Sequence, residues 1–202
     1  MTSTIGQFTT PTEAHNTFDS EPNEGNFTLE ETARIGVWLF IASEVFLFAA
    51  IISVRFYYWK EAPLPEHLNQ ELGLIVTAIL LASSYTAYRA ETLAAHGDRA
   101  GFQRNALLTI SLGLVFMIGV GMEWAEAFAD FPVSTTYGTI FLTTTGFHAF
   151  HVLTGLLALL FAVLQGDRIT PDRHAWAEGA VKYWHFVDIV WVVVYPSLYL
   201  LT

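Results

Sequence analysis

Five long apolar segments, separated by short polar loops, constrain this chain more than any other feature of its sequence. A helix needs about 20 apolar residues to cross the roughly 30 Å hydrocarbon core of a membrane. Only 14% of the 202 residues are charged, against about a quarter in soluble domains. The sequence therefore predicts an all-α integral membrane protein. It forms a bundle of five transmembrane helices, with spans near residues 34–58, 71–93, 104–126, 136–165 and 179–201.

Residues 1–33 differ from the five-helix domain of residues 34–202, because they hold six acidic residues and no lysine or arginine. They lack the basic start and short apolar core of a signal peptide. We expect an acidic cytoplasmic tail that is either solvated or bound to a partner. Thr28, followed three positions later by Glu31, has the spacing of a capping box and predicts that a helix begins near the end of the tail.

Basic residues near the span ends predict the orientation of the bundle. Seven lie on the side shared by the tail and the second and fourth loops, and two, Arg55 and Lys60, lie on the other side. Lysine and arginine are enriched in cytoplasmic loops. In a bacterial plasma membrane, the N-terminus would then be cytoplasmic and the C-terminus outside. The net charge of −10 argues against a nucleic-acid partner.

Five ionisable residues lie where hydrocarbon is expected. Counted from the cytoplasmic span ends at about 1.5 Å per residue, Glu44 and Asp188 are roughly 15 Å deep and His185 about 10 Å deep. By the same count, His148 and His151 are roughly 20–25 Å deep. The histidine pair, and likewise His185 with Asp188, is spaced i,i+3, so each pair shares one helix face.

A charge at mid-bilayer costs several kcal/mol unless it is paired or neutralised. We therefore expect these residues to form a buried polar cluster between the first, fourth and fifth spans. Glu44 would keep its proton or pair with a histidine or arginine. Two roles are open for the cluster: a hydrogen-bonded network that fixes helix register, or the handling of protons. Glu123, near the outer end of the third span, is a further candidate.

Cysteine is absent, so any metal site is limited to histidine and carboxylate ligands. Di-iron bundles repeat Glu-x-x-His on two helices, and no span contains that motif. His148 or His151 could instead clamp a b-type haem with His185, which would make the chain a haem-binding anchor. An ion carrier built around Glu44 and Asp188 is another alternative.

Four sequence blocks, in order, carry a family resemblance. They are "WLFIASEVFLF" around Glu44, "GMEWAEAF" around Glu123, "YGTIFLTTTGFHAFHVLTG" around His148 and His151, and "YWHFVDIVWVVVYPSLYL" near the C-terminal end. Together they cover roughly residues 34–201, and the last two are highly specific. The chain resembles the cytochrome c oxidase subunit III family of haem–copper terminal oxidases, in its five-helix bacterial form.

The resemblance implies a subunit with no catalytic residue, haem, copper or other metal of its own. It would contact the catalytic subunit I directly, within a complex that also holds subunit II, and would support proton uptake during oxygen reduction. Haem and copper would lie in partner subunits, membrane lipids would surround the chain, and phospholipid could be bound. A quinol oxidase subunit III and an accessory subunit of a nitric oxide reductase are alternatives. The implied proton-handling positions are Glu44, His148, His151, His185 and Asp188, with Glu123 as a secondary motif position.

Overall fold

The computed structural model describes residues 29–65, 68–166, 170 and 174–201. These residues form five α-helices, and a short π-helix, η2, follows the last of them. The predicted all-α five-helix bundle is confirmed, and each predicted span overlaps one helix. The elements are α1 (Leu29–Tyr57), α2 (Gln70–Ala95), α3 (Arg99–Asp130), α4 (Thr136–Leu164), α5 (Ala175–Tyr195) and η2 (Pro196–Leu200).

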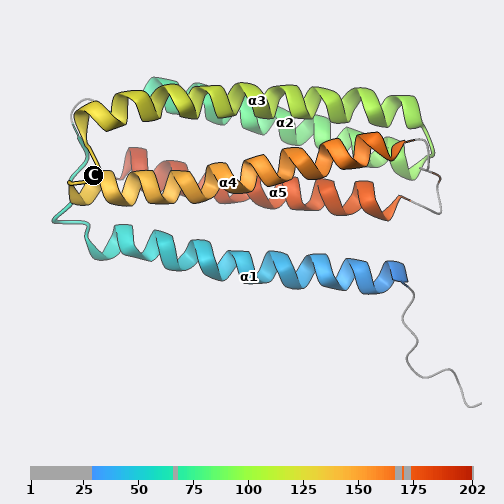
Figure 1. Ribbon diagram of the computed structural model, residues 1–202, viewed down its shortest axis with the longest axis horizontal. Coiled ribbons are helices and arrows are strands. Elements are labelled where there is room, and N and C mark those ends of the chain that lie inside the picture. Colours follow the sequence, from blue (N-terminus) through green and yellow to red (C-terminus); the bar gives the residue numbers. More distant parts are fainter. Residues whose placement is uncertain (1–28, 66–67, 167–169, 171–173, 202) are drawn as a thin grey trace, which may run out of the picture.

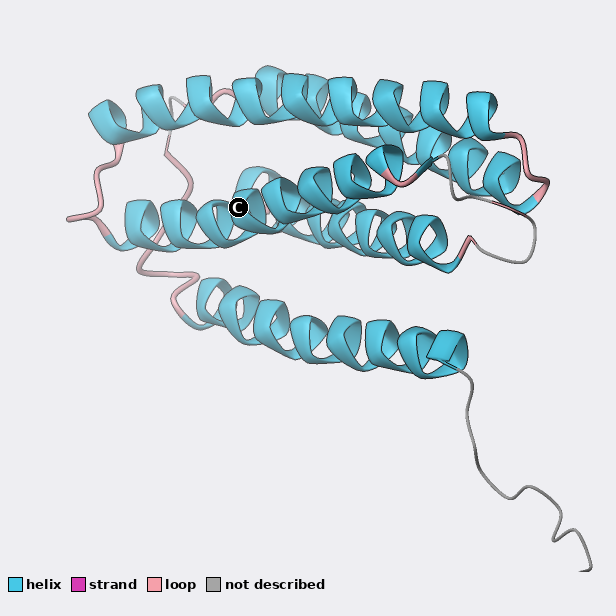
Figure 2. Ribbon diagram, turned by 45° about the vertical axis from the view of Figure 1, so that its right-hand side comes forward, coloured by secondary structure: helices cyan, strands magenta, loops and turns pink. Residues whose placement is uncertain are grey.

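The helices run side by side, with α1 at the edge of the bundle (Figure 1). The α2–α3 pair packs against α4 and α5, and α1 contacts α4, α5 and η2. A second view shows the same separation of α1 from the other four helices (Figure 2). Large apolar side chains on α1 are exposed, including Phe46 at 78% and Leu39 at 67%. The packing of α1 is therefore the least extensive in the bundle.

Short turns reverse the chain between α2 and α3 and between α3 and α4. Between α2 and α3, Gly97 adopts a φ of 74°, which costs glycine little, and its N–H donates to the Ala94 carbonyl (3.0 Å). Asp98 then caps α3, because its Oδ1 accepts from the Gly101 N–H at 2.9 Å. Thr135 caps α4 in the same way, accepting from Gly138 at 3.0 Å. These caps fix where the antiparallel helices begin.

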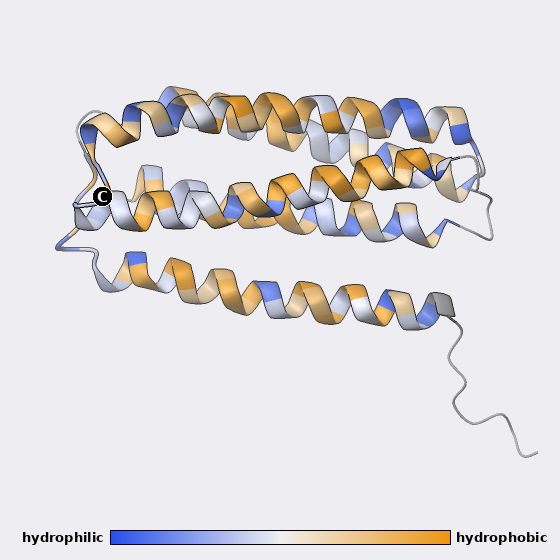
Figure 3. Ribbon diagram, in the orientation of Figure 1, coloured by the Kyte–Doolittle hydropathy of each residue, from blue (hydrophilic) through white to orange (hydrophobic). Residues whose placement is uncertain are grey.

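Four of the helices described are long and apolar enough to cross a membrane: residues Glu31–Tyr57, Gln70–Ala95, Arg99–Asp130 and Thr136–Leu164. Hydrophobic residues follow the lengths of the helices and hydrophilic ones gather toward their ends (Figure 3). The remaining helix, α5, carries Glu178, Lys182 and Asp188 within 21 residues. Since α5 packs along α4, its crossing of the membrane stays a prediction supported by its place in the bundle.

The core is held together by tryptophans that pair with hydroxyls on other helices. From α5, the Trp184 and Trp191 indole N–H groups donate to Ser83 Oγ (3.1 Å) and Thr77 Oγ1 (2.9 Å) of α2. A hydrogen-bonding partner is needed for a buried indole N–H. Gly113 of α3 gives the Trp184 ring its space, since a Cβ there would lie 2.6 Å from the ring. The inner face of α5 is therefore tied to both helices of the α2–α3 hairpin.

Two boundaries differ from the sequence-based prediction. Residues 29–33, which we assigned to the tail, already belong to α1, while Thr28 lies outside the described residues. At the other end, the α-helix stops at Tyr195 instead of continuing to residue 201. Proline lacks a backbone N–H, and after Pro196 the chain closes a wider turn in which Leu201 N donates to the Pro196 carbonyl at 3.0 Å.

Candidate functional site

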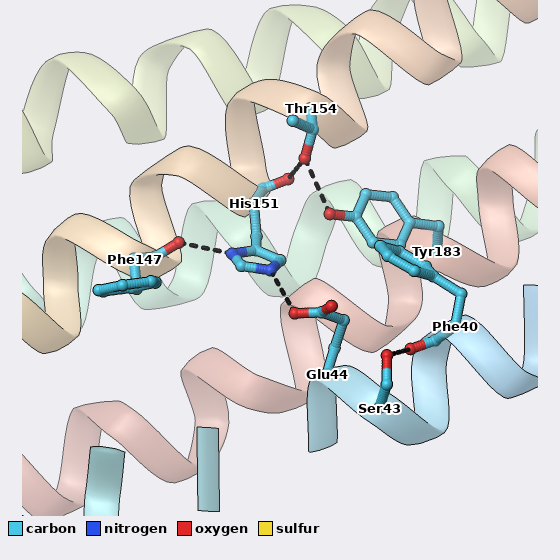
Figure 4. Close-up of polar contacts among 7 residues, drawn as sticks. All are labelled: Phe40, Ser43, Glu44, Phe147, His151, Thr154 and Tyr183. Atoms are coloured by element: carbon cyan, nitrogen blue, oxygen red, sulfur yellow. Dashed lines mark hydrogen bonds and ion pairs between the residues drawn. The ribbon is translucent and has the colours of Figure 1, made fainter. Parts of the chain in front are cut away.

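Glu44 of α1 and His151 of α4 form an ion-pairing contact near the middle of both helices (Figure 4). The Glu44 Oε2–His151 Nε2 distance is 2.9 Å, and their side chains are 16% and 7% exposed. Each residue lies about 20 Å from either end of its helix, at 1.5 Å per residue. The structure therefore brings together two of the predicted residues at mid-membrane depth.

The contacts of His151 decide how many protons this pair holds. His151 Nδ1 lies 2.6 Å from the Phe147 carbonyl oxygen. A carbonyl only accepts hydrogen bonds, so Nδ1 carries a hydrogen. The pair is then either ionised Glu44 with imidazolium, or protonated Glu44 with neutral imidazole. In both states one proton is shared and the net charge is zero, which explains how the pair is tolerated in a low-dielectric environment.

Tyr183 of α5 and Thr154 of α4 extend this group (Figure 4). Thr154 Oγ1 donates to the His151 carbonyl at 2.9 Å, so its only hydrogen is committed. The Tyr183 hydroxyl, 2.8 Å from Thr154 Oγ1, is therefore the donor of that second bond. Phe40 of α1 packs on the Tyr183 ring at 5.7 Å. Sequence reasoning missed Tyr183 and Thr154, which carry no charge and resemble ordinary span residues.

A pocket of about 430 Å³ lies over these residues, between α1 and α4. Its wall is mostly aromatic and apolar, and it includes the Glu44–His151 pair. The rim side chains Phe150, Phe40 and Phe147 are 62%, 49% and 44% exposed, so the pocket opens at the surface of the bundle. It is lined by Phe40, Glu44, Leu47, Phe147, Phe150, His151, Thr154 and Tyr183.

His185 and Asp188 lie elsewhere, against α2. Ser84 Oγ donates to Asp188 Oδ2 and lies 3.2 Å from His185 Nδ1. Asp188 is 3% exposed, and its Oδ1 is buried with no hydrogen-bond partner among the described residues. The predicted single cluster between the first, fourth and fifth spans is therefore wrong: α2 supplies the partner of Asp188. Ser84 is one of several span serines, and its spacing did not single it out.

His148 belongs to neither of these two groups. Its ring is fully buried and packs on Trp191 at 4.8 Å, Phe116 at 5.9 Å and Phe48 at 6.3 Å. Neither ring nitrogen has a hydrogen-bond partner in the described part of the chain. Phe48 also packs on the His151 ring, at 4.9 Å. His148 and His151 are both buried on α4, as their i,i+3 spacing predicted, but His148 is packed among aromatic rings.

Glu123 belongs to a third polar group, near the predicted outer end. It is 3% exposed, and its Oε2 accepts a 2.6 Å hydrogen bond from the Tyr199 hydroxyl. Nearby, Arg55 is only 1% exposed, although its position suggested an interfacial residue. The Arg55 guanidinium lies 4.9 Å from the Trp59 ring centroid and 5.8 Å from that of Tyr137. Cation–π contacts therefore replace part of its lost hydration.

An ion-pair network joins α1 to α5 at the predicted cytoplasmic end. Glu178 Oε2 lies 2.9 Å from Arg34 Nη2, and Glu178 Oε1 pairs with Lys182. Glu178 lies in the first turn of α5, before the predicted span. Burial raises the pKa of this carboxyl, but the hydrogen bond and charge of Lys182 and the charge of Arg34 outweigh burial. The pKa of Glu178 is therefore lowered overall.

The histidines that sequence analysis considered as a haem clamp have different neighbours. Glu44 contacts His151, Ser84 contacts His185, and aromatic rings enclose His148. Within the described ranges, no three histidine, aspartate, glutamate or cysteine side chains come together as a metal-binding group. Glu44 and His151 instead contact one another directly, at 2.9 Å.

Comparison with known proteins identifies the family. The family model described as cytochrome c oxidase subunit III matches residues 15–202. The probable cytochrome c oxidase subunit 3 of Nocardia farcinica is 34% identical over 174 residues, covering 82% of this chain and 86% of that protein. That of Mycobacterium leprae is 30% identical and covers 98% of both chains, whereas the Dugong dugon subunit is 36% identical and is covered over 70% of its length. The chain therefore belongs to the cytochrome c oxidase subunit III family.

Proposed function

We propose that this chain is the non-catalytic subunit III of a bacterial aerobic haem–copper terminal oxidase. It lies in the plasma membrane with its N-terminus in the cytoplasm. Haem and copper are carried by partner subunits, and this chain supplies no redox centre. The bacterial relatives support the proposal, since they match this five-helix chain over most or all of their length.

The Glu44–His151 pair is the observation that carries the proton-supporting role. It holds one shared proton at mid-membrane depth, 2.9 Å between its partners, beside a pocket that opens at the bundle surface. Gain or loss of that proton would charge the pair, which is costly at this depth unless a charge change in a neighbouring subunit compensates it. Such a pair can take up or release a proton in step with a neighbouring subunit.

In this proposal the chain contacts the catalytic subunit I directly and stabilises it, within a complex that also contains subunit II. Exposed aromatic and aliphatic side chains on several helices support it, because such surfaces face lipid or another subunit. Examples are Tyr85 of α2 at 62% exposure and Ile118 of α3 at 64%. Glu44 and Asp188 have different neighbours, His151 and Ser84 respectively.

A pull-down of the tagged chain in mild detergent tests the proposal. We expect a large haem-bearing subunit in the eluate, with a reduced-minus-oxidised haem spectrum that disappears when this chain is stripped away. Oxidation of added cytochrome c by the eluate supports the proposal, whereas oxidation of quinol alone points to a quinol oxidase. A chain that elutes alone and colourless contradicts the subunit assignment, and one that elutes alone with haem makes its histidines ligands.

A further inference from the structure

We propose that the pocket between α1 and α4 binds a neutral, lipid-soluble molecule with a flat ring that carries hydroxyl groups, of the phenol or quinol kind. The binding involves no redox step in this chain. The site is formed by α1, α4 and Tyr183 of this chain alone, so it stands or falls independently of the proposed subunit function.

The position of the pocket limits which molecules can reach it. Glu44 and His151 lie about 20 Å from the ends of their helices, so the pocket opens in the hydrocarbon layer. Phe150 and Phe147 at its rim are exposed there. Water-soluble ligands are excluded from that layer, whereas a molecule dissolved in the membrane can diffuse to the opening.

The net charge of the polar residues that line the pocket limits the charge that the ligand's head group can carry. The Glu44–His151 pair has a net charge of zero in either arrangement of its shared proton, and Tyr183 and Thr154 beside it are neutral. A phosphate or fatty-acid carboxylate would bring an uncompensated charge into hydrocarbon, because Glu44 already neutralises the only histidine of the lining. The pocket therefore favours an uncharged head.

The free hydrogen-bonding positions of the pocket determine which head group the ligand must have. Glu44 Oε1 makes no hydrogen bond with any described residue, and it is an acceptor in both states of the pair. The Tyr183 hydroxyl uses its hydrogen on Thr154, so its oxygen has acceptor capacity left. Both open positions accept, so a matching ligand must donate. Phenols and quinols donate O–H groups, whereas the esters and acyl chains of phospholipids do not.

The lining and size favour a flat ring. Phe40, Tyr183, Phe147 and Phe150 supply four aromatic rings around about 430 Å³. That volume lies within the ordinary range for small-molecule pockets, and aromatic rings pack well on one another at 4.5–7 Å between centroids. A ring with a short aliphatic tail can fill the pocket and leave its tail among the lipids.

Photoaffinity labelling of the membrane complex purified through this chain tests the site. The probe is an alkyl phenol with a diazirine on its chain, and labelled peptides are located by mass spectrometry. We expect labels on α1 and α4 around Leu47 and Phe150. Because decylubiquinol donates hydrogen bonds and decylubiquinone does not, the quinol should displace the probe at about tenfold lower concentration.

Two variants and a control sharpen the test. Leu47→Trp fills the pocket and should abolish labelling of these peptides, whereas Ile118→Trp, on an exposed position of α3, should leave it unchanged. Tyr183→Phe removes one acceptor and should weaken binding about fivefold without a change of shape. The same Phe substitution tests the site even if Leu47→Trp disturbs folding.

Several results would overturn the proposal. Equal displacement by quinol and quinone would remove the role of the acceptors. Labelling that survives Leu47→Trp in a folded complex would place the probe elsewhere. If a diazirine phosphatidylcholine labels the same peptides and the phenol cannot displace it, the pocket is an acyl-chain groove.

Discussion

Arg55 of α1 donates a hydrogen bond from Nη2 to the carbonyl oxygen of Leu201, 3.2 Å away and 146 residues later in the chain. Two neighbouring carbonyls in this terminal segment are also satisfied by other helices. Tyr137 of α4 donates to Leu198 at 2.8 Å, and Gln70 of α2 donates to Tyr199 at 3.0 Å. A helix end leaves its last carbonyls without intrahelical partners, and here three separate helices supply them.

Replacing Arg55 by methionine should loosen this terminal segment. The Leu201 carbonyl would lose its donor and the Trp59 ring its cation, at a cost of about 1–3 kcal/mol. Thermal unfolding of the detergent-solubilised chain, with protease cleavage near the C-terminal end, measures the effect. Lys60→Met removes the same charge from an exposed position and is the matched control. Equal stability of the two variants would contradict the role assigned to Arg55.

Glu44→Gln should leave assembly of the complex intact. Glutamine keeps the shape of the side chain and can donate to His151 Nε2, but it cannot share a titrating proton. Glu44→Leu should lower the yield, because His151 then has a buried polar atom with no partner, at about 1–3 kcal/mol. Purified complex yield and turnover as a function of pH separate the two effects. Glu126→Gln, on an exposed carboxylate of α3, is the control. Loss of the chain in Glu44→Gln would favour a purely structural role.

Asp188→Ala should be more damaging than Asp188→Asn. Alanine leaves Ser84 and His185 without the carboxylate that organises them, at about 1–3 kcal/mol. Asparagine keeps an acceptor oxygen for Ser84. The yield of folded chain and its thermal midpoint test this order, with the exposed Asp130→Ala as the control. A normal yield of Asp188→Ala would show that the contact with Ser84 is dispensable.

Gly113→Ala should destabilise the bundle by about 1–3 kcal/mol through overpacking. The new methyl group would lie 2.6 Å from the Trp184 ring and 2.7 Å from Leu156. Gly121→Ala on the same helix meets nothing within 4 Å, so it should be neutral or slightly stabilising. Thermal midpoints of the two variants provide the comparison. Similar midpoints would mean that Trp184 has room to move.

The Arg34–Glu178–Lys182 network should stabilise the chain in a pH-dependent way. Because the pKa of Glu178 is lowered in the folded state, its contribution is complete above the unfolded-state value of about 4.3. It is then lost as the pH falls through the folded-state pKa. At pH ~7 the thermal midpoint of Glu178→Gln should therefore lie below that of the unmodified chain. At pH ~3 the two midpoints should be nearly equal. The exposed Glu61→Gln is the control, and a gap that persists in acid would contradict this assignment.

Apolar run lengths were sufficient to place the helices, because each span needs its own 20-residue hydrophobic stretch. Depth alone also placed Glu44, His148 and His151 at overlapping heights, but it left open whether Glu44 keeps its proton or pairs with a histidine or arginine. It could not identify the partner of Asp188, because which helices touch depends on packing at glycines such as Gly113 and on indole bonds such as that of Trp184. Position on a span likewise could not distinguish a buried Arg55 from an interfacial one.

Three of the polar contacts that hold α1 to the bundle have a consequence for the order of assembly during translation. Arg34, Glu44 and Arg55 bind Glu178, His151 and Leu201, at separations of 144, 107 and 146 residues. The helix that leaves the ribosome before the other four is therefore the last to be secured, since its partners are made near the end of translation. Until then Arg34, Glu44 and Arg55 lack these partners. A chain that stops before α5 would lack the partners of two of those three, Arg34 and Arg55, so its first helix would be held to the bundle less completely than in the full chain.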